Sequence, residues 1–126
     1  MEEPILLNKS TENMQAAKLL SNNKLYNAAT SRKYYSAYQK AIYILDKHKI
    51  DYQKDGHSSH YKTIGTLIKH VAASKEDEKI LRKLNNIRVL RNNCDYKHDF
   101  LMSKEKYDSE IKSKILNIDQ VLNKYC

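Results

Sequence analysis

The sequence has few of the residues that turn a polypeptide chain sharply. Only two glycines and one proline occur in 126 residues, so a fold of many short strands and tight hairpins is not expected. Ala, Leu, Lys, Asn, Ile and Tyr are common instead, which suits a few long helices with short connections. The length fits a single domain over residues 1–126 with a core of its own.

Cysteines and long apolar runs are also scarce. The only cysteines, Cys94 and Cys126, show no paired spacing, which is typical of proteins from a reducing compartment. No segment approaches the roughly 20 apolar residues that a membrane span needs. The start of the chain has acidic residues before a very short apolar run, MEEPILLNK, which does not resemble a signal peptide. We therefore expect a cytoplasmic protein with no membrane partner.

Positive charge is in excess. Lys and Arg number 23 against 15 Asp and Glu, a formal net charge of +8. This excess favours a polyanionic partner such as RNA. Arg32, Lys33 and Lys40 are candidates for binding phosphate, although lysines spread over a solvated surface would give the same composition. Composition alone leaves both interpretations open.

Apolar residues recur at helical spacing in five stretches, which predicts an all-α fold. We predict helices over residues 11–22, 26–49 and 59–73, a fourth beginning after Ser74, and a fifth running from Ser103 to the chain end. Ser10 or Thr11 is expected to cap the first, and the two serines to cap the last two. The helix over 26–49 has two apolar faces, so it should lie at the centre. Short connections predict an up-and-down bundle of four to five helices.

The fourth predicted helix carries polar residues within its apolar stripe. At 100° per residue, Arg91 and His98 project into the same sector as the apolar side chains, and Arg88 and Asp95 lie at its edge. Asn92 and Tyr96 point further round. The apolar members of the stripe are Ile80, Leu84, Ile87, Leu90 and Cys94. An arginine in this position needs a partner, because an unpaired buried charge is costly.

Three partners are open for Arg91: Asp95, a second subunit, or a phosphate. An ion pair with Asp95 four residues later is worth only a few tenths of a kcal/mol. Arg91 and His98 are roughly 10 Å apart along a continuous helix, too far to hold one phosphate together. Two antiparallel copies around a twofold axis would instead bring Arg91 of one chain near His98 of the other. We therefore expect a homodimer built largely on this helix.

The spacing of Arg91 and His98 is weakly specific by itself. With this composition, an Arg followed by a His after four to six residues is expected by chance about half the time. Requiring an Asn directly after the Arg, as with Asn92, lowers this to about 0.04.

Three longer segments carry a further signal: AATSRKYYSAYQKAIYIL (28–45), HSSHYKTIGTLIKH (57–70) and LRNNCDYKHDFLMSKEKYDSEI (90–111). Together they resemble the HEPN domain family, a helical family found alone or beside minimal nucleotidyltransferases in bacterial defence and toxin–antitoxin loci. The first resembles that family's Ala-rich helix with a Tyr-Tyr pair, and the second the segment where a His-Ser pair opens the third helix. The third resembles the Arg-x-x-x-Asp-Tyr end of helix four.

The resemblance implies a function for the fourth helix. In HEPN proteins an Arg–polar–His signature marks metal-independent ribonucleases, and Arg91, Asn92 and His98 match it, with Arg88, Asp95 and Tyr96 as supporting residues. It implies a toxin or defence effector that cleaves RNA without cofactor or metal, with a nucleotidyltransferase antitoxin as a possible partner. The Arg-x-x-x-Asp-Tyr subgroup often lacks the histidine, so the alternative is a non-catalytic module that binds such a partner or a nucleotide.

Other candidates have simpler structural explanations. His57 and His60 have the spacing of half a metal site, but no further ligands follow in a recognisable pattern, so a role at the start of a helix is favoured. The Tyr34–Tyr35 pair could stack on bases, although helical spacing favours a place in the core. Gly65 is expected to permit close packing of its helix.

Overall fold

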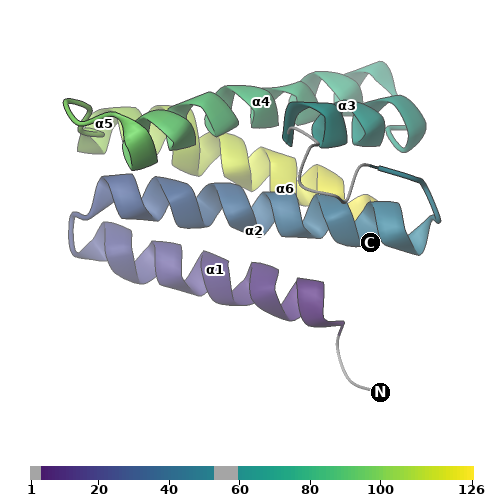
Figure 1. Ribbon diagram of the computed structural model, residues 1–126, viewed down its shortest axis with the longest axis horizontal. Coiled ribbons are helices and arrows are strands. Elements are labelled where there is room, and N and C mark those ends of the chain that lie inside the picture. Colours follow the sequence, from purple (N-terminus) through teal and green to yellow (C-terminus); the bar gives the residue numbers. More distant parts are fainter. Residues whose placement is uncertain (1–3, 53–59) are drawn as a thin grey trace.

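The protein is a bundle in which one long helix is surrounded by the others. The computed structural model describes residues 4–52 and 60–126, and no strand occurs in these ranges. The helices are α1 (Ile5–Asn22), α2 (Tyr26–Lys47), α3 (His60–His70), α4 (Lys75–Tyr96), and a final run of α5 (Lys104–Lys106), η1 (Tyr107–Lys112) and α6 (Ser113–Tyr125). In Figure 1, α1 lies along one side of α2, α3 and α4 along the other, and α6 behind. The predicted all-α bundle is confirmed.

The central position predicted for residues 26–49 is also confirmed. Helix α2 contacts α1, α3, α4, η1 and α6, and its small and apolar side chains form the middle of the core. Its buried residues include Ala29, Ala37, Ala41, Ile44 and Leu45. Alanines let neighbouring helices approach closely, and each buried Leu or Ile stabilises the fold by about 1.5–3 kcal/mol.

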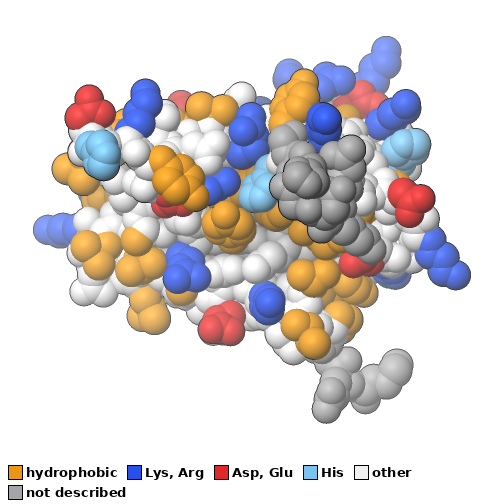
Figure 2. Space-filling model, viewed as in Figure 1, with side chains coloured by type: hydrophobic (Ala, Val, Ile, Leu, Met, Phe, Trp, Pro, Cys, Tyr) orange, Lys and Arg blue, Asp and Glu red, His pale blue; other side chains and the backbone are white. Residues whose placement is uncertain are grey.

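Charged side chains are dispersed over the face shown in Figure 2. Lys and Arg side chains occur on every side of this view, and Asp and Glu side chains lie among them. No helix of the described chain is both long and apolar enough to cross a membrane.

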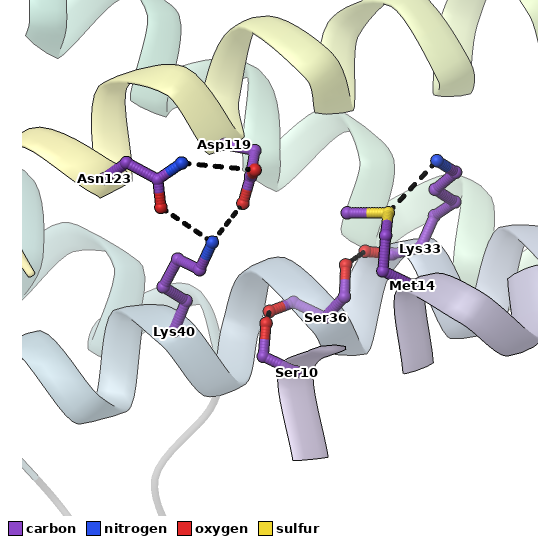
Figure 3. Close-up of polar contacts among 7 residues, drawn as sticks. All are labelled: Ser10, Met14, Lys33, Ser36, Lys40, Asp119 and Asn123. Atoms are coloured by element: carbon purple, nitrogen blue, oxygen red, sulfur yellow. Dashed lines mark hydrogen bonds and ion pairs between the residues drawn. The ribbon is translucent and has the colours of Figure 1, made fainter. Parts of the chain in front are cut away.

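The first helix begins earlier than predicted. It starts at Ile5 after Pro4, so Ser10 lies inside the helix and is buried rather than serving as its cap. Proline is favourable at such a start because its fixed φ suits the first turn and its missing N–H has no helical partner to lose. The Ser10 hydroxyl donates to the Ser36 carbonyl of α2 at 2.6 Å (Figure 3). A serine is therefore tolerated within α1 because α2 supplies its acceptor.

Two helices are followed, just beyond their ends, by a lysine in the left-handed region where glycine would be usual. Lys24 and Lys49 have φ of 62° and 56°. After α2, the N–H of Ile50 donates to Leu45 and that of Lys49 to Asp46, at 2.9 and 3.1 Å. The same pattern follows α1, where the N–H of Leu25 donates to Leu20 and that of Lys24 to Ser21, at 2.9 and 3.0 Å. These are Schellman-type ends, so the scarcity of glycine did not prevent sharp helix stops.

The capping serines of the last two helices are confirmed. The Ser74 side chain accepts from the N–H of Asp77, and that of Ser103 from the N–H of Lys106, both at 3.1 Å. Asp77 is itself buried, and the Tyr125 hydroxyl donates to its carboxylate at 2.5 Å. Lys124 pairs with the same carboxylate at 3.0 Å, so the start of α4 is fixed to the end of α6.

A π-helical segment explains the spacing of the last apolar stripe. Tyr107, Ile111 and Ile115 are buried, although two steps of four residues would drift by about 80° around an α-helix. The wider turn of η1 reduces this drift and keeps the three side chains on one face. Gly65, by contrast, does not serve close packing: it is exposed, and a Cβ there would meet no described atom within 4 Å.

Candidate functional site

Arg91 lies on the buried face of α4, as its position in the stripe predicted. Its residue exposure is 6%. The buried face is rotated slightly from the predicted one, because Asp77 and Leu81 are buried. The predicted members Ile80, Leu90 and Cys94 are only partly buried.

Arg91 finds its surroundings mainly on α2. The Cζ atom lies 5.1 Å from the ring centroid of Tyr34 and 5.1 Å from that of Tyr35. An arginine over a desolvated aromatic ring gains up to about 2 kcal/mol. Tyr34 is fully buried, which confirms its expected place in the core. The arginine is therefore accommodated within one chain, and its burial alone does not require a second subunit.

The hydrogen-bonding capacity of Arg91 is only partly used. One terminal nitrogen pairs with a carboxylate oxygen of Asp95 at 3.5 Å, and that oxygen also accepts from the Ser31 hydroxyl at 3.3 Å. Among residues 4–52 and 60–126, the buried Nε atom has no hydrogen-bond partner. A guanidinium carries five donors, so Arg91 retains donors for an anion.

His98 does not lie on the helical stripe, contrary to our prediction. Helix α4 ends at Tyr96, and Lys97 is extended with φ −88° and ψ 121°. His98 is exposed in the following turn, and Tyr96 is 71% exposed. The seven-residue spacing from Arg91 therefore does not translate into a shared helix face. Asn92, directly after Arg91, is partly buried.

A residue of α2, missed by sequence reasoning, holds the turn that carries His98. The side-chain amide of Asn27 donates to the carbonyls of Cys94 and Phe100, at 3.3 and 3.1 Å. Its oxygen accepts from the N–H of Met102 at 2.7 Å. Asn27 thus closes the end of α4 and fixes the turn from both sides. No local pattern indicates this, since the partners lie 67–75 residues away in sequence.

His60 is the histidine that the fold brings into the aromatic cluster beneath Arg91. The Tyr34 hydroxyl and His60 Nδ1 are 2.8 Å apart. The imidazole stacks on Tyr38 with centroids 4.1 Å apart and planes inclined by 18°, and it meets Tyr35 edge-on. Sequence reasoning treated His60 as half of a metal site or a residue at a helix start. It does open α3, but its contacts are with α2.

The electrostatic surroundings of His60 favour its neutral form. Burial lowers the pKa of His60, and the nearby Arg91 and Arg88 lower that pKa further. Burial also raises the pKa of Tyr34, so its hydroxyl keeps its proton at neutral pH. Arg88 lies one turn before Arg91, with Cζ 5.9 Å from the centroid of the exposed Tyr61 ring. Two cations, one imidazole and several phenol rings therefore meet where α2, α3 and α4 come together.

Figure 2 shows this meeting point from outside. Near the middle of the view, Lys or Arg side chains lie beside a His side chain and hydrophobic ones, where α3 and α4 pass over α2. The cluster is partly open to solvent, because His60 and Arg88 are only partly buried and Tyr61 is 60% exposed, although Arg91 itself is largely covered. His57 lies outside the described residues. In the described ranges, no three His, Cys, Asp or Glu side chains gather where they could hold a metal ion.

The basic residues of α2 lie away from this cluster. The Lys40 ammonium pairs with Asp119 at 2.6 Å and donates to Asn123 at 2.8 Å, both on α6 (Figure 3). Arg32 donates to Asn13 of α1 at 3.0 Å. These contacts connect α2 to its neighbours, so neither side chain is simply a solvated cation.

Lys33 lines a groove of about 410 Å³ between α1 and the final helical run. Its ammonium contacts the Met14 sulfur at 3.1 Å (Figure 3). Burial and the nearby Lys112 lower the pKa of Lys33, while Asp119 raises it. The groove is lined by Lys33, Lys112, Asp108 and Asp119 and contains no histidine, so it lies apart from both Arg91 and His60.

The sequence matches the HEPN domain family over residues 4–120. No curated protein matches it. The match extends across all the described helices except the last residues of α6, and the all-helical bundle is consistent with the HEPN fold. This supports a general nuclease-, RNA- or nucleotide-related role. The chain belongs to the HEPN family.

Proposed function

We propose that this protein is a metal-independent endoribonuclease of the HEPN type. The observation that carries the proposal is Arg91: its guanidinium is buried, makes one long ion pair, and has an Nε atom without a partner in the described chain. A cation held in this way can receive negative charge without first reorganising its surroundings. Asn92 and His98 follow it in the order of the Arg–polar–His signature.

The chemistry needs a proton carrier and a stabilised phosphate. A histidine accepts the proton of the RNA 2′-hydroxyl, and the 2′-oxygen attacks the adjacent phosphorus. The bond to the 5′-oxygen breaks, and that oxygen takes up a proton as it leaves. The products are a 2′,3′-cyclic phosphate and a 5′-hydroxyl. In this proposal Arg91 stabilises the charge on the phosphate, His98 transfers protons, and Asn92 orients the histidine or the phosphate.

We also propose that the site is shared between two subunits. Within one chain, the end of α4 and the extended Lys97 separate Arg91 from the exposed His98. A twofold axis could bring His98 of the partner subunit towards Arg91. The protein would then act as a cytoplasmic toxin or defence effector, neutralised by a nucleotidyltransferase antitoxin.

A second candidate function is favoured by the contacts of Arg91 within its own chain. Asp95 and the two tyrosine rings give this arginine a structural role whether or not RNA is cleaved. The protein would then be a non-catalytic module that binds a nucleotidyltransferase or a nucleotide. In either case, binding to RNA through lysines should weaken steeply as salt is raised.

The test is cleavage of a labelled single-stranded RNA by the pure protein in EDTA. His98→Ala and Arg91→Met should each reduce cleavage by about 100-fold or more. His70→Ala is the matched control, because His70 is an exposed histidine at the end of α3, and it should cleave as the wild type does.

Mixed dimers test the shared site. Combining an Arg91→Met chain with a His98→Ala chain should restore cleavage, because one intact site forms from the two unaltered residues. Full activity in His98→Ala, or a monomer that cleaves, would contradict the shared site. If the wild type cleaves no RNA, the ribonuclease proposal is wrong and the non-catalytic binding module is the function that stands.

A further inference from the structure

Side chains from two different helices, α3 and α4, lie near the same pair of tyrosine rings on α2. Arg91, from α4, has its Cζ 5.1 Å from the centroids of Tyr34 and Tyr35. The His60 ring, from α3, has its centroid 5.7 and 6.1 Å from the same two. Helix α2 thus brings a guanidinium and an imidazole to the same two rings, and Arg91 is near enough to influence the protonation of His60.

The charges that face His60 are predominantly positive. From α4 they are Arg88 and Arg91, whose influence on the imidazole opposes its protonation. From α2 the imidazole meets the phenol rings of Tyr34, Tyr35 and Tyr38. Burial raises the pKa of Tyr34, so that ring carries no charge at neutral pH. Asp95 is occupied with Arg91 and Ser31. The two arginines therefore share one carboxylate, that of Asp95, and the surroundings of His60 keep an excess of positive charge.

The donors that remain are suited to a phosphate. The Tyr34 hydroxyl holds Nδ1 of His60, so within residues 4–52 and 60–126 Nε2 is the ring nitrogen left for a ligand. Arg88 is only partly buried, and the hydrogen bond from its Nε to Asn85 is long, at 3.5 Å. The Tyr61 ring beside it is 60% exposed and offers a surface on which a base could stack. The Nε of the buried Arg91 has no hydrogen-bond partner in the described chain, so the positive charge behind this surface is only partly compensated.

We propose that His60, Arg88 and Arg91 form a binding site for a backbone phosphate of single-stranded nucleic acid, with Tyr61 as its stacking surface. Arg88 and His60 Nε2 contact the phosphate, while Arg91 lies behind them and adds positive charge. The site lies within one chain. It deepens the proposed function, on which the RNA assignment rests, by naming where the strand is held beside the cleavage site.

The probe is a short oligothymidylate, which has a backbone phosphate but no 2′-hydroxyl and so cannot be cleaved. The His60 imidazole is followed by NMR during pH titrations with and without the probe. A bound phosphate offsets the arginine charges, so the His60 pKa should rise by about half a unit or more. The signal of the exposed His70 should shift much less.

Two arginine variants distinguish a specific phosphate site from nonspecific electrostatic attraction between the basic protein and the oligonucleotide. Arg88→Gln should weaken oligothymidylate binding about tenfold. Arg32→Gln, exposed on α2 where its side chain contacts Asn13 of α1, removes the same charge away from the cluster and should weaken it about twofold or less. Equal weakening by the two variants, or an unchanged His60 titration at saturating probe, would overturn the phosphate site.

The outcomes distinguish this proposal from ribonuclease activity. If the His60 pKa rises on binding the probe but the protein cleaves no RNA, the phosphate site is supported and the ribonuclease proposal is rejected. If the protein cleaves RNA but the probe leaves the His60 pKa unchanged, the ribonuclease proposal is supported and the phosphate site is rejected.

Discussion

Replacing Arg91 by methionine should separate the role of this arginine in folding from its role with RNA. The change removes two cation–ring contacts of about 1 kcal/mol each and an ion pair of about 0.3–0.5 kcal/mol. It also removes the unmet hydrogen bonding of the buried Nε, which costs about 1–3 kcal/mol. The methionine sulfur regains about 0.3–1.5 kcal/mol against an aromatic ring. We therefore expect a free energy of unfolding between about 1 kcal/mol below and about 2 kcal/mol above that of the wild type.

The measurement is urea denaturation followed by far-UV circular dichroism near neutral pH. Arg91→Ala should lose about 2–3 kcal/mol, because it leaves a cavity that methionine fills. Arg82→Met, on the exposed side of α4, controls for the change in residue type. A loss of more than about 3 kcal/mol in Arg91→Met would refute this reasoning. It would show that the charge itself holds α4 against α2, so any loss of cleavage in this variant could come from misfolding.

Three further predictions concern stability and use the same denaturation assay. Gly65→Ala should stabilise the protein by about 0.5–1 kcal/mol, because Gly65 lies at an exposed position inside α3 with space for a Cβ; a loss of stability would contradict this. Lys24→Gly should add up to about 1 kcal/mol, because it relieves a positive φ, and no gain would mean that the lysine side chain compensates. Asp77→Asn should lose about 1–2 kcal/mol at neutral pH. The hydrogen bonds from Tyr125 and Lys124 lower the pKa of Asp77, so this stabilisation is present above the unfolded pKa near 4 and is lost as pH falls through the folded value; a difference between wild type and variant that stays constant down to acid pH would contradict it.

The parts of the fold that follow local rules could be predicted from the sequence. Ser74 and Ser103 begin their helices as expected because a cap depends on residues within one turn. The central position of α2 followed from its two apolar faces. The start of α1 was missed because Ser10 has the chemistry of a cap, while its actual acceptor is the carbonyl of Ser36 on another helix.

The candidate site depends on contacts that local rules do not contain. The stripe correctly placed Arg91 on the buried face, yet it gave no information on which element would surround it. Tyr34 and Tyr35 were expected in the core for their spacing, and nothing in that spacing indicates a guanidinium above them. His60 was expected only at a helix start. Its aromatic contacts could not be foreseen, because they come from α2, which is distant in sequence.

The end of α4 shows why the spacing of a motif must be combined with the tertiary structure. Arg91 and His98 share a helix face only if the helix continues through both residues. It stops at Tyr96, where Asn27 of α2 accepts and donates hydrogen bonds on both sides of the turn. The relation between the two residues is therefore set by an asparagine far away in sequence and not by their separation. The arginine belongs to a cluster inside the chain and the histidine to its surface, and so the proposed ribonuclease site needs a second subunit, whereas the proposed phosphate site does not.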